Sequence, residues 1–185
     1  KENEEHFCMH FHIPLQGGCD NTLKRMNRKY NISEYQSKID LIRSYFNDVN
    51  ITTDVLAGFS GETEEDFTNS IEFIENINFG EMHVFPYSRR PLTKAYNFDN
   101  VVDDITKRKR VNDLLELNRK KAIEYRNKFL NKDLYVLVEK NENGICFGHT
   151  SNYLEVEFKD NNAKENDLVL VSIYEIGYPR CIGRR

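Results

Sequence analysis

Hydrophobic and polar positions follow two alternating patterns over the first 130 residues of the chain. Short apolar runs at residues 10–15, 51–57 and 82–87 predict buried strands. Elsewhere apolar residues recur every three or four positions, which predicts helices over residues 20–28, 33–46, 63–77 and 103–129. The alternation of strands and helices predicts parallel strands joined by helical crossovers. The expected N-terminal caps of the first three helices are Asp20 or Asn21, Ser33 and Thr63.

A different pattern begins after residue 131. Short strands are predicted at residues 134–138, 153–158, 168–173 and 181–183, with turn residues at 141–144 and 160–162 between them. No helical period remains in this segment, and a series of short strands is typical of a small antiparallel barrel. The predicted domains are therefore residues 1–130 and 131–185, with a boundary near Leu130.

The three predicted parallel strands have enough helices to cover only one face of their sheet. The other face would be the interior of a complete or partial barrel. The expected fold class is therefore α/β, a partial (half) parallel βα barrel followed by a small antiparallel β-barrel. The rest of the first barrel is expected to precede residue 1. Ligands would bind at the carboxyl ends of the parallel strands.

Composition limits the function classes. The chain has 185 residues, a net charge of -4 and no apolar run of membrane-spanning length. It therefore has no global basic field to attract nucleic acid, and we expect neither membrane insertion nor a signal peptide. We expect reduced thiols in a cytoplasmic protein and no metal site made within this chain. The four cysteines contain no C-x-x-C pair and are Cys8, Cys19, Cys146 and Cys181.

Positive charge is concentrated in the last predicted helix. Residues 103–129 carry nine Lys and Arg against five Asp and Glu, whereas residues 131–185 carry seven against nine. Lys107–Arg110 and Arg119–Lys121 could meet RNA phosphates, or they could form an ordinary solvated helix face. Both interpretations stay open, and any RNA binding has to come from local patches.

Two polar residues are unusual in their predicted strands. Asp54 is a lone carboxylate inside the apolar run ITTDVLA, where burial is costly unless the charge is paired. Its plainer interpretation is an ion pair with a neighbouring strand or with Arg28. Gln16 lies where the first strand ends, and its plainer interpretation is an amide that stabilises the following turn. Strand histidines are usually packed and hydrogen-bonded, so no function is assigned to His10, His12 and His83.

The chain resembles the radical S-adenosylmethionine methylthiotransferases in three segments, which read HIPLQGGCDNTLKRMNRKY, TTDVLAGFSGETEEDF and HVFPYSRRPLTKA. They resemble the fourth, fifth and sixth strands of that family's barrel. The last is most similar to the subgroup that modifies threonylcarbamoyladenosine in tRNA, and residues 131–185 resemble the TRAM domain that ends these enzymes. The sequence departs from the family pattern at Gly17, where serine is usual, at Ser60 for a proline and at Leu92 for a glycine.

This resemblance implies a transferase with S-adenosyl-L-methionine and 4Fe-4S clusters as cofactors. A reduced cluster would cleave S-adenosylmethionine to a deoxyadenosyl radical, and the radical would remove hydrogen from C2 of an adenosine beside the anticodon. Sulfur and a methyl group would then be added at C2. The chain has no C-x-x-x-C-x-x-C for the radical-generating cluster, so those ligands are expected upstream. The chain alone is expected to be inactive, with no catalytic residue and no metal ligand.

By the same resemblance, three polar residues are expected to hold S-adenosylmethionine. Asp54 would face the ribose hydroxyls. Gln16 would contact the ribose or the amino-acid part. Arg28 would bind the methionine carboxylate, because a guanidinium binds a carboxylate through two hydrogen bonds; its plainer role is a solvated surface arginine.

Three further residues are expected around the adenine. Gly58 would let the backbone approach the base closely, and its plainer role is a turn. Phe85 and Ser88 would flank the base, although core packing is the plainer role of Phe85. The complete expected binding set is Gln16, Arg28, Asp54, Gly58, Phe85 and Ser88.

The partner implied by the resemblance is the anticodon region of a tRNA. One rival is an RNA-binding module without catalysis, and another is a sister enzyme that acts on isopentenyladenosine tRNA or on a ribosomal protein. The oligomeric state stays open. Because the tail is slightly acidic, RNA contacts there would need local groups, namely Arg180, Arg184 and Arg185 with Tyr153, Phe158 or Tyr178.

Overall fold

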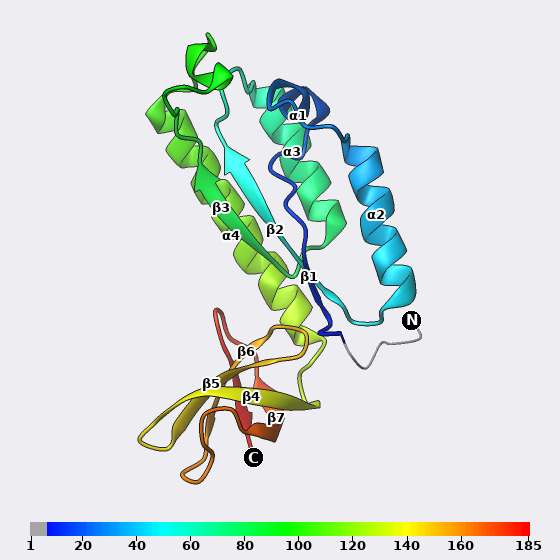
Figure 1. Ribbon diagram of the computed structural model, residues 1–185, viewed down its shortest axis with the longest axis vertical. Coiled ribbons are helices and arrows are strands. Elements are labelled where there is room, and N and C mark those ends of the chain that lie inside the picture. The colour runs from blue at the N-terminus through cyan, green and yellow to red at the C-terminus, as the bar shows by residue number, and fades with distance from the viewer. Residues whose placement is uncertain (1–6) are drawn as a thin grey trace. The chain divides into compact units, whose positions relative to one another are not determined.

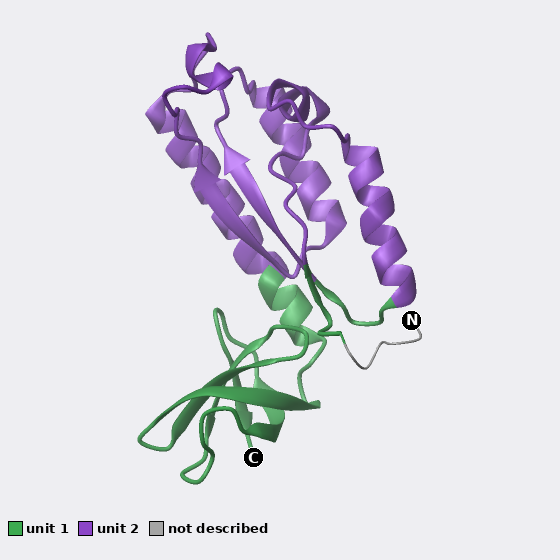
Figure 2. Cartoon of the chain, viewed as in Figure 1, with its two compact units in different colours: residues 1–11, 46–50, 122–185 green, residues 12–45, 51–121 purple. Residues whose placement is uncertain are grey.

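The computed structural model describes residues 7–185, which form two compact units (Figure 2). One unit comprises residues 12–45 and 51–121. The other contains the described residues up to Phe11, residues 46–50 and residues 122–185. This division falls inside the longest helix, whereas the predicted boundary near Leu130 lies just after that helix. The assignment of domains to residues 1–130 and 131–185 stays a prediction.

Most of a three-stranded sheet lies in the unit of residues 12–45 and 51–121, which is unit 2 in Figure 2. Its strands follow the order β1 (His10–His12), β2 (Asn50–Ala57) and β3 (Glu81–Pro86). β2 and β3 are parallel. The chain continues along β2 beyond β1, because Gln16 forms a parallel bridge with Val55. The connecting helices are α1 (Asp20–Arg25), α2 (Ile32–Tyr45), α3 (Glu64–Ile77), the short η2 (Lys94–Asn97) and α4 (Asp104–Asn127) (Figure 1). The predicted α/β class is confirmed.

This sheet has one covered face and one open face. Successive side chains of a strand point to opposite faces, and the helices lie against one of them (Figure 1). The β2 residues on the covered face are buried, namely Ile51, Thr53, Val55 and Ala57. At alternate positions Asp54 and Leu56 are only half-buried, and Phe85 is 48% exposed. We call this second side the open face; it carries His12, Asp54, Leu56, His83 and Phe85.

The start of α1 differs from the prediction. The residue before the helix is Cys19, whose side chain makes no capping hydrogen bond. The carboxylate of Asp20 instead accepts a hydrogen bond from the backbone N–H of Ile32 at 2.8 Å. Asp20 therefore stabilises the start of α2 from the first turn of α1, a contact between segments that local spacing does not reveal.

The next two helices, α2 and α3, each begin with a capping box. Asn31, and not Ser33, caps α2: its side-chain oxygen accepts from the N–H of Glu34 at 2.9 Å, and the Glu34 carboxylate accepts from the N–H of Asn31 at 3.1 Å. The predicted cap of α3 is confirmed, because Thr63 and Asp66 form the same reciprocal pair. Each box satisfies two backbone donors that a helix start leaves unpaired.

The chain after α4 forms a closed barrel. Its strands follow the order β4-β5-β6-β8-β7, and β7 pairs with β4 to close it. Adjacent strands are antiparallel except β6 and β8, which are parallel. The predicted small barrel is confirmed, with β5 as a strand that the sequence pattern missed. The bounds are β4 (Asp133–Glu142), β5 (Ile145–Thr150), β6 (Glu155–Lys159), β7 (Leu168–Glu175) and β8 (Cys181–Arg184).

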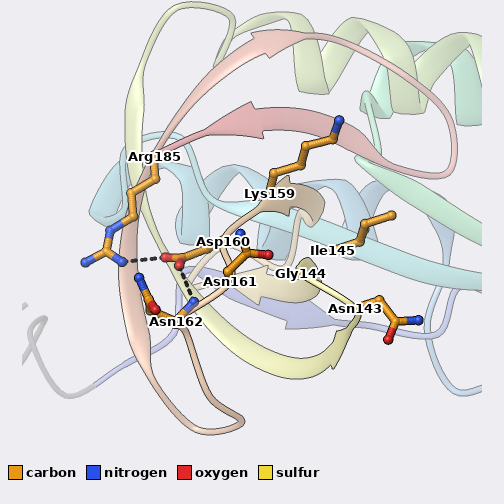
Figure 3. Close-up of a pocket in the computed structure, with 8 residues that line it drawn as sticks. All are labelled: Asn143, Gly144, Ile145, Lys159, Asp160, Asn161, Asn162 and Arg185. Carbon is orange, nitrogen blue, oxygen red and sulfur yellow. Dashed lines mark hydrogen bonds and ion pairs between the residues drawn. The ribbon is translucent and has the colours of Figure 1, made fainter.

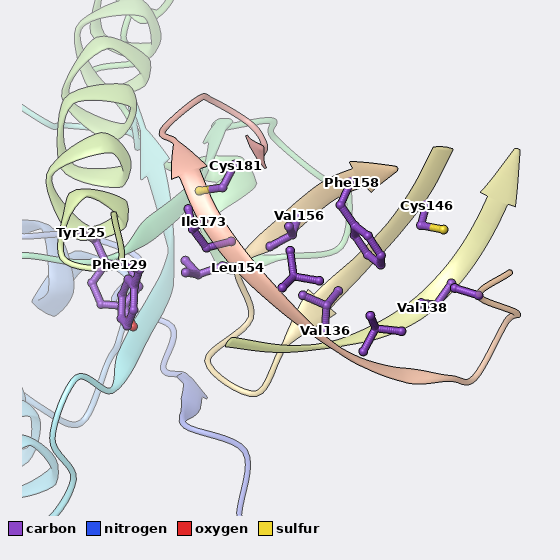
Figure 4. Packing of buried hydrophobic residues seen from close by; sticks show 13 residues of the cluster. Tyr125, Phe129, Val136, Val138, Cys146, Leu154, Val156, Phe158, Ile173 and Cys181 are labelled. Atoms are coloured by element: carbon purple, nitrogen blue, oxygen red, sulfur yellow. The ribbon is translucent and has the colours of Figure 1, made fainter. Parts of the chain in front are cut away.

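The barrel interior is filled by aliphatic side chains, two thiols and one phenyl ring (Figure 4). Val136 and Val156 have no exposed surface, and Phe158 is 1% exposed. Tyr125 and Phe129, from the end of α4 and the residues just after it, belong to the same buried cluster. Phe158 is therefore a core residue, and its expected alternative role in RNA binding is wrong.

Two adjacent glycines after β1 differ in how much space surrounds them. A Cβ on Gly18 would lie 2.8 Å from the backbone oxygen of Ser70 and 3.0 Å from its Cα. A Cβ on Gly17 would meet side-chain atoms alone, the nearest being the methyl group of Thr22 at 3.2 Å. A side-chain methyl can shift by a few tenths of an ångström, whereas the backbone of α3 resists the same displacement.

We therefore expect Gly18→Ala to lower the free energy of unfolding by about 2–3 kcal/mol and Gly17→Ala by less than about 1 kcal/mol. Urea unfolding of the two variants and the wild type measures this difference. Equal losses in the two variants would contradict the close packing of α3 on Gly18.

Candidate functional site

The open face carries a paired carboxylate. Asp54 lies in the middle of β2, and 27% of its side chain is exposed. His12 Nε2 lies 3.4 Å from Asp54 Oδ2, and His12 Nδ1 lies 3.0 Å from the hydroxyl oxygen of Thr52. His83 of β3 is the register partner of Asp54, and its ring centroid is 5.7 Å from that of His12. Of the two partners expected for Asp54, the structure has the neighbouring strand, through its contact with His12, and not Arg28.

Gln16 and Asp54 belong to neighbouring positions of the sheet. The N–H of Gln16 donates to the carbonyl of Asp54 at 2.8 Å, and the carbonyl of Gln16 accepts from the N–H of Leu56 at 2.9 Å. Gln16 has a left-handed backbone with φ of 66°, which is uncommon for a residue with a side chain. The structure therefore brings these two expected ligand residues together where β1 ends.

Gly58 is less accessible than we expected. Its φ of 76° suits glycine, but a Cβ there would lie 2.8 Å from Cγ of Lys107, so the stem of this lysine covers the backbone. Its amide donates to the Glu62 carboxylate at 3.1 Å. A nucleobase could approach Gly58 only after the Lys107 side chain moved aside, so its role as a ligand contact stays a prediction.

Phe85 and Ser88 lie on β3 and in the loop that follows it. Phe85 is on the open face and nearly half exposed. Within the described part of the chain it is therefore not a core residue. Ser88 is exposed. The N–H of Tyr87 donates to the carbonyl of Ala57 at 2.8 Å, which keeps the start of this loop beside the end of β2.

Arg28 is exposed in the segment between α1 and α2. Two residues later the Tyr30 hydroxyl donates to the carbonyl of Leu15 at 2.8 Å, which anchors this segment beside the end of β1. The structure therefore brings the backbone of the Arg28 segment near the strand ends. It joins Arg28 to neither Asp54 nor Gln16 through a contact.

A buried carboxylate fixes the turn that leads away from β1. Asp66 accepts hydrogen bonds from the Cys19 thiol at 3.4 Å and from the side chains of Asn21 and Arg25 at 3.0 Å each. Burial alone would raise the pKa of Asp66, but hydrogen bonds from the Thr63 backbone and from Asn21, Arg25 and Cys19 outweigh it and hold this pKa well below its ordinary value. Burial also raises the pKa of the Cys19 thiol, which makes it a poor nucleophile.

The basic run of α4 is partly internal. Arg110 is 3% exposed and pairs with Glu62 at 2.7 Å and with Glu64 at 3.0 Å. Lys121 is 7% exposed and donates to Asn78. Arg110 and Lys121 therefore join α4 to the two ends of α3. They are buried, so they neither bind phosphate nor form part of a solvated helix face. The exposed basic residues left in the two runs include Arg108, Lys109 and Arg119.

Tyr153 is the more exposed of two surface tyrosines of the barrel that the sequence suggested for RNA contact. It is 54% exposed, and its ring is stacked between His10 at 4.5 Å and His149 at 4.4 Å. The neighbouring Asn152 is buried, and its amide donates to the hydroxyl of Tyr125 at 3.1 Å. The loop that presents Tyr153 is therefore firmly held, and both faces of the ring are already occupied.

The three arginines of the tail differ in their surroundings. Arg180 pairs with Glu155, and its guanidinium lies 4.9 Å from the ring centroid of Phe147. Arg185 pairs with Asp160, whereas Arg184 is exposed. Tyr178, also proposed from sequence, is 37% exposed and lies under the guanidinium of Arg126 at 5.3 Å.

A hollow of about 630 Å³ lies beside Arg185 on the barrel surface (Figure 3). Its carboxylate, Asp160, accepts hydrogen bonds from the backbone of Asn162 at 2.8 Å and of Ala163 at 3.2 Å, in addition to its contact with Arg185. The Asn162 N–H and the Arg185 guanidinium hold the pKa of Asp160 below its ordinary value. Asp160 and Arg185 therefore satisfy each other, and the remaining polar side chains of the lining are Lys159 and three asparagines.

The described residues contain neither a metal-ligand group nor a membrane-spanning helix. Within residues 7–185, no group of three or more His, Cys, Asp or Glu side chains is arranged to hold a metal ion. None of the helices in that range is both long and apolar enough to cross a membrane.

Known proteins are similar to this chain over most of its length. The Radical SAM superfamily model matches residues 1–74. A threonylcarbamoyladenosine tRNA methylthiotransferase, MtaB, of Bacillus subtilis is 37% identical over 92% of this chain and 39% of its own length. Over most of its length the chain is similar to radical SAM methylthiotransferases. The same-named enzyme of Thermotoga maritima is 38% identical over 94% of this chain and 41% of its own length, so the chain spans about two fifths of these relatives.

Other similar proteins carry a different name or share only the fold. A tRNA-2-methylthio-N(6)-dimethylallyladenosine synthase of a Thermoanaerobacter species is 42% identical over 71% of this chain and 28% of its own length. Among solved structures, the coproporphyrinogen III oxidase HemN of Escherichia coli, described as a radical SAM enzyme, matches with a TM-score of 0.52. It is 14% identical and covers 60% of this chain and 26% of its own, so this match supports the fold alone.

Radical SAM methylthiotransferases use S-adenosylmethionine and 4Fe-4S clusters, and the described residues fit these two groups differently. The open face offers a partly exposed carboxylate and an exposed aromatic ring, which suit a nucleoside with a ribose diol and a base. Gln16 is hydrogen-bonded to Asp54 through its backbone. A cluster needs several thiolates together, whereas Cys19 is buried beside Asp66, and Cys146 and Cys181 are buried in the apolar interior of the barrel. The described residues therefore fit S-adenosylmethionine but do not form a cluster site.

Proposed function

We propose that this chain is the carboxyl-terminal part of a tRNA methylthiotransferase that modifies C2 of N6-threonylcarbamoyladenosine next to the anticodon. The observation that carries the proposal is similarity to two enzymes of that name over more than nine tenths of this chain. We further propose that residues 131–185 are a TRAM domain that contacts the tRNA, and that the protein works in the cytoplasm, where tRNA is modified.

S-adenosylmethionine would bind at the open face. In this proposal Asp54 accepts hydrogen bonds from the ribose hydroxyls, and Gln16 contacts the ribose or the amino-acid part of the ligand. Arg28 pairs with the carboxylate of the ligand's methionine part. Gly58, Phe85 and Ser88 would surround the adenine. When bound beside a reduced 4Fe-4S cluster, S-adenosylmethionine supplies the radical chemistry and the methyl group. The cluster ligands would come from the part of the protein outside this chain, which by itself would be inactive.

A sister specificity is the second candidate, because relatives named for dimethylallyladenosine are similarly close. The test uses the full-length protein, reconstituted with iron and sulfide and supplied with S-adenosylmethionine and a reductant. Purified tRNAs carrying either threonylcarbamoyladenosine or dimethylallyladenosine are the substrates, and mass spectrometry of the nucleosides reads the C2 methylthio product. We expect product from the first tRNA only. Product from the second alone would establish the sister activity, and no product from either would refute the proposal.

A further inference from the structure

His12 is the residue of the open face that contacts Asp54. Its imidazole is held between two groups of β2, with Nδ1 at 3.0 Å from the Thr52 hydroxyl oxygen and Nε2 at 3.4 Å from Asp54 Oδ2. Its side chain is 37% exposed, so this contact lies at the surface that a ligand would approach. The ring therefore bridges β1 to the carboxylate of the neighbouring strand.

A neutral imidazole satisfies both partners at once. A carboxylate carries no proton, so the neutral tautomer that suits this contact has its proton on Nε2, which faces Asp54 Oδ2 at 3.4 Å. Nδ1 is then an acceptor, and the Thr52 hydroxyl can donate to it. Thr52 thus fixes the ring orientation, and the ring occupies one oxygen of the carboxylate, which leaves the other oxygen and the remaining lone pairs for a ligand.

We infer that His12 is a positioning residue that holds the Asp54 carboxylate in the orientation that binds the ribose diol of S-adenosylmethionine. The inference rests on the proposed function, because that function assigns Asp54 to the ribose. A carboxylate with free rotation about its side-chain bonds would have to be ordered when the ligand binds. Two neighbouring contacts, one from Thr52 to His12 and one from His12 to Asp54, impose that order in advance.

Three substitutions separate the contacts of the ring. His12→Phe keeps the ring shape without either nitrogen. His12→Asn can keep a polar atom near Thr52 but cannot reach Asp54, whereas His12→Gln can place an amide N–H near the position of Nε2. His83→Gln is the matched control, because it removes a neighbouring imidazole without removing either contact of His12.

We expect His12→Phe and His12→Asn to weaken S-adenosylmethionine binding about tenfold, and His12→Gln and His83→Gln to stay within about threefold of the wild type. Equilibrium dialysis with S-adenosylmethionine and the reconstituted full-length protein measures these affinities. At saturating S-adenosylmethionine, kcat for methylthiolation should change less than about threefold in all four variants. Wild-type affinity in His12→Phe would overturn the inference, as would equal losses in the Gln and Phe variants.

A double-mutant cycle separates this inference from the proposed function. If His12 acts through Asp54, His12→Phe should have almost no effect on affinity once Asp54→Ala is present. The same tenfold loss in both backgrounds would show that His12 acts independently, and would overturn the inference alone. Unchanged affinity in Asp54→Ala itself would instead refute the assignment of the ribose site.

Discussion

Asp54→Ala in the reconstituted full-length protein is expected to weaken S-adenosylmethionine binding about a hundredfold, because two hydrogen bonds from the ribose hydroxyls to a charged acceptor are lost. Methylthiolation at limiting S-adenosylmethionine should fall by a similar factor. Equilibrium dialysis gives the affinity, and mass spectrometry of the tRNA nucleosides gives the product. Asp54→Asn should lie between wild type and Asp54→Ala, since an amide oxygen still accepts hydrogen bonds but carries no charge.

The control for this prediction removes the same charge from the same unit. Asp40 is exposed on α2, where its carboxylate accepts a hydrogen bond from Gln36. Asp40→Ala should leave both the affinity and the product yield within about twofold of wild type, as expected of most surface substitutions. An equal loss in Asp40→Ala and Asp54→Ala would mean that net charge, and not a ribose contact, explains the effect.

The second large effect is on stability. Asp66→Asn is expected to lower the free energy of unfolding by about 2–4 kcal/mol at pH 7, because it removes the buried negative charge and replaces one of the two acceptor oxygens by an amide group, which cannot accept from Arg25 and the Thr63 N–H. Urea unfolding followed by circular dichroism measures the loss. Glu65→Gln is the matched control: it removes an exposed charge from the same helical turn and should cost less than about 0.5 kcal/mol.

The stability difference between wild type and Asp66→Asn is expected to depend on pH. The folded state holds the pKa of Asp66 well below its ordinary value of 3.8. The stability that ionised Asp66 contributes is therefore present above this value and lost as pH falls below it toward the folded pKa. The gap between wild type and Asp66→Asn should accordingly be constant from pH 7 to 5 and narrow below about pH 4. A gap that stays constant down to pH 2.5 would contradict the proposed role of the carboxylate charge.

The spacing of apolar residues predicted most of the helices and strands, because it indicates which residues are buried. The strands β2 and β3, and helices α3 and α4, lie within a residue or two of their predicted bounds. β5 was missed because Gly148 and His149 interrupt its apolar alternation, although Gly148 pairs with both Val138 and Val156. The parallel pairing of β6 and β8 also depends on contacts between distant segments, which no local pattern encodes.

Capping and burial of charge were harder to predict for the same reason. Asp20 has the composition of an N-cap, yet its carboxylate bonds to the start of the following helix. Arg110 belongs to a run that resembles a solvated helix face, but its guanidinium is buried against Glu62, which lies 48 positions earlier. Whether a charged side chain faces water or a partner is decided by folding, and spacing along one helix does not determine it.

The candidate site was predicted in part. A lone carboxylate in an apolar strand directed attention to Asp54, and the structure has it half-exposed on the open face near Gln16. The contact of His12 with Asp54 was missed because strand histidines are usually structural. The sequence does contain a possible pair, because an imidazole can donate a hydrogen bond and a carboxylate can accept one. Recognising it required the pairing of β1 with β2.

The most direct test of the central claim is the crystal structure of the reconstituted full-length protein with S-adenosylmethionine bound. We predict the ribose hydroxyls within hydrogen-bond distance of the Asp54 carboxylate, with His12 still in contact with it and the adenine beside Phe85. A nucleoside bound away from the ends of β1, β2 and β3, with Asp54 in contact only with His12, would contradict the account.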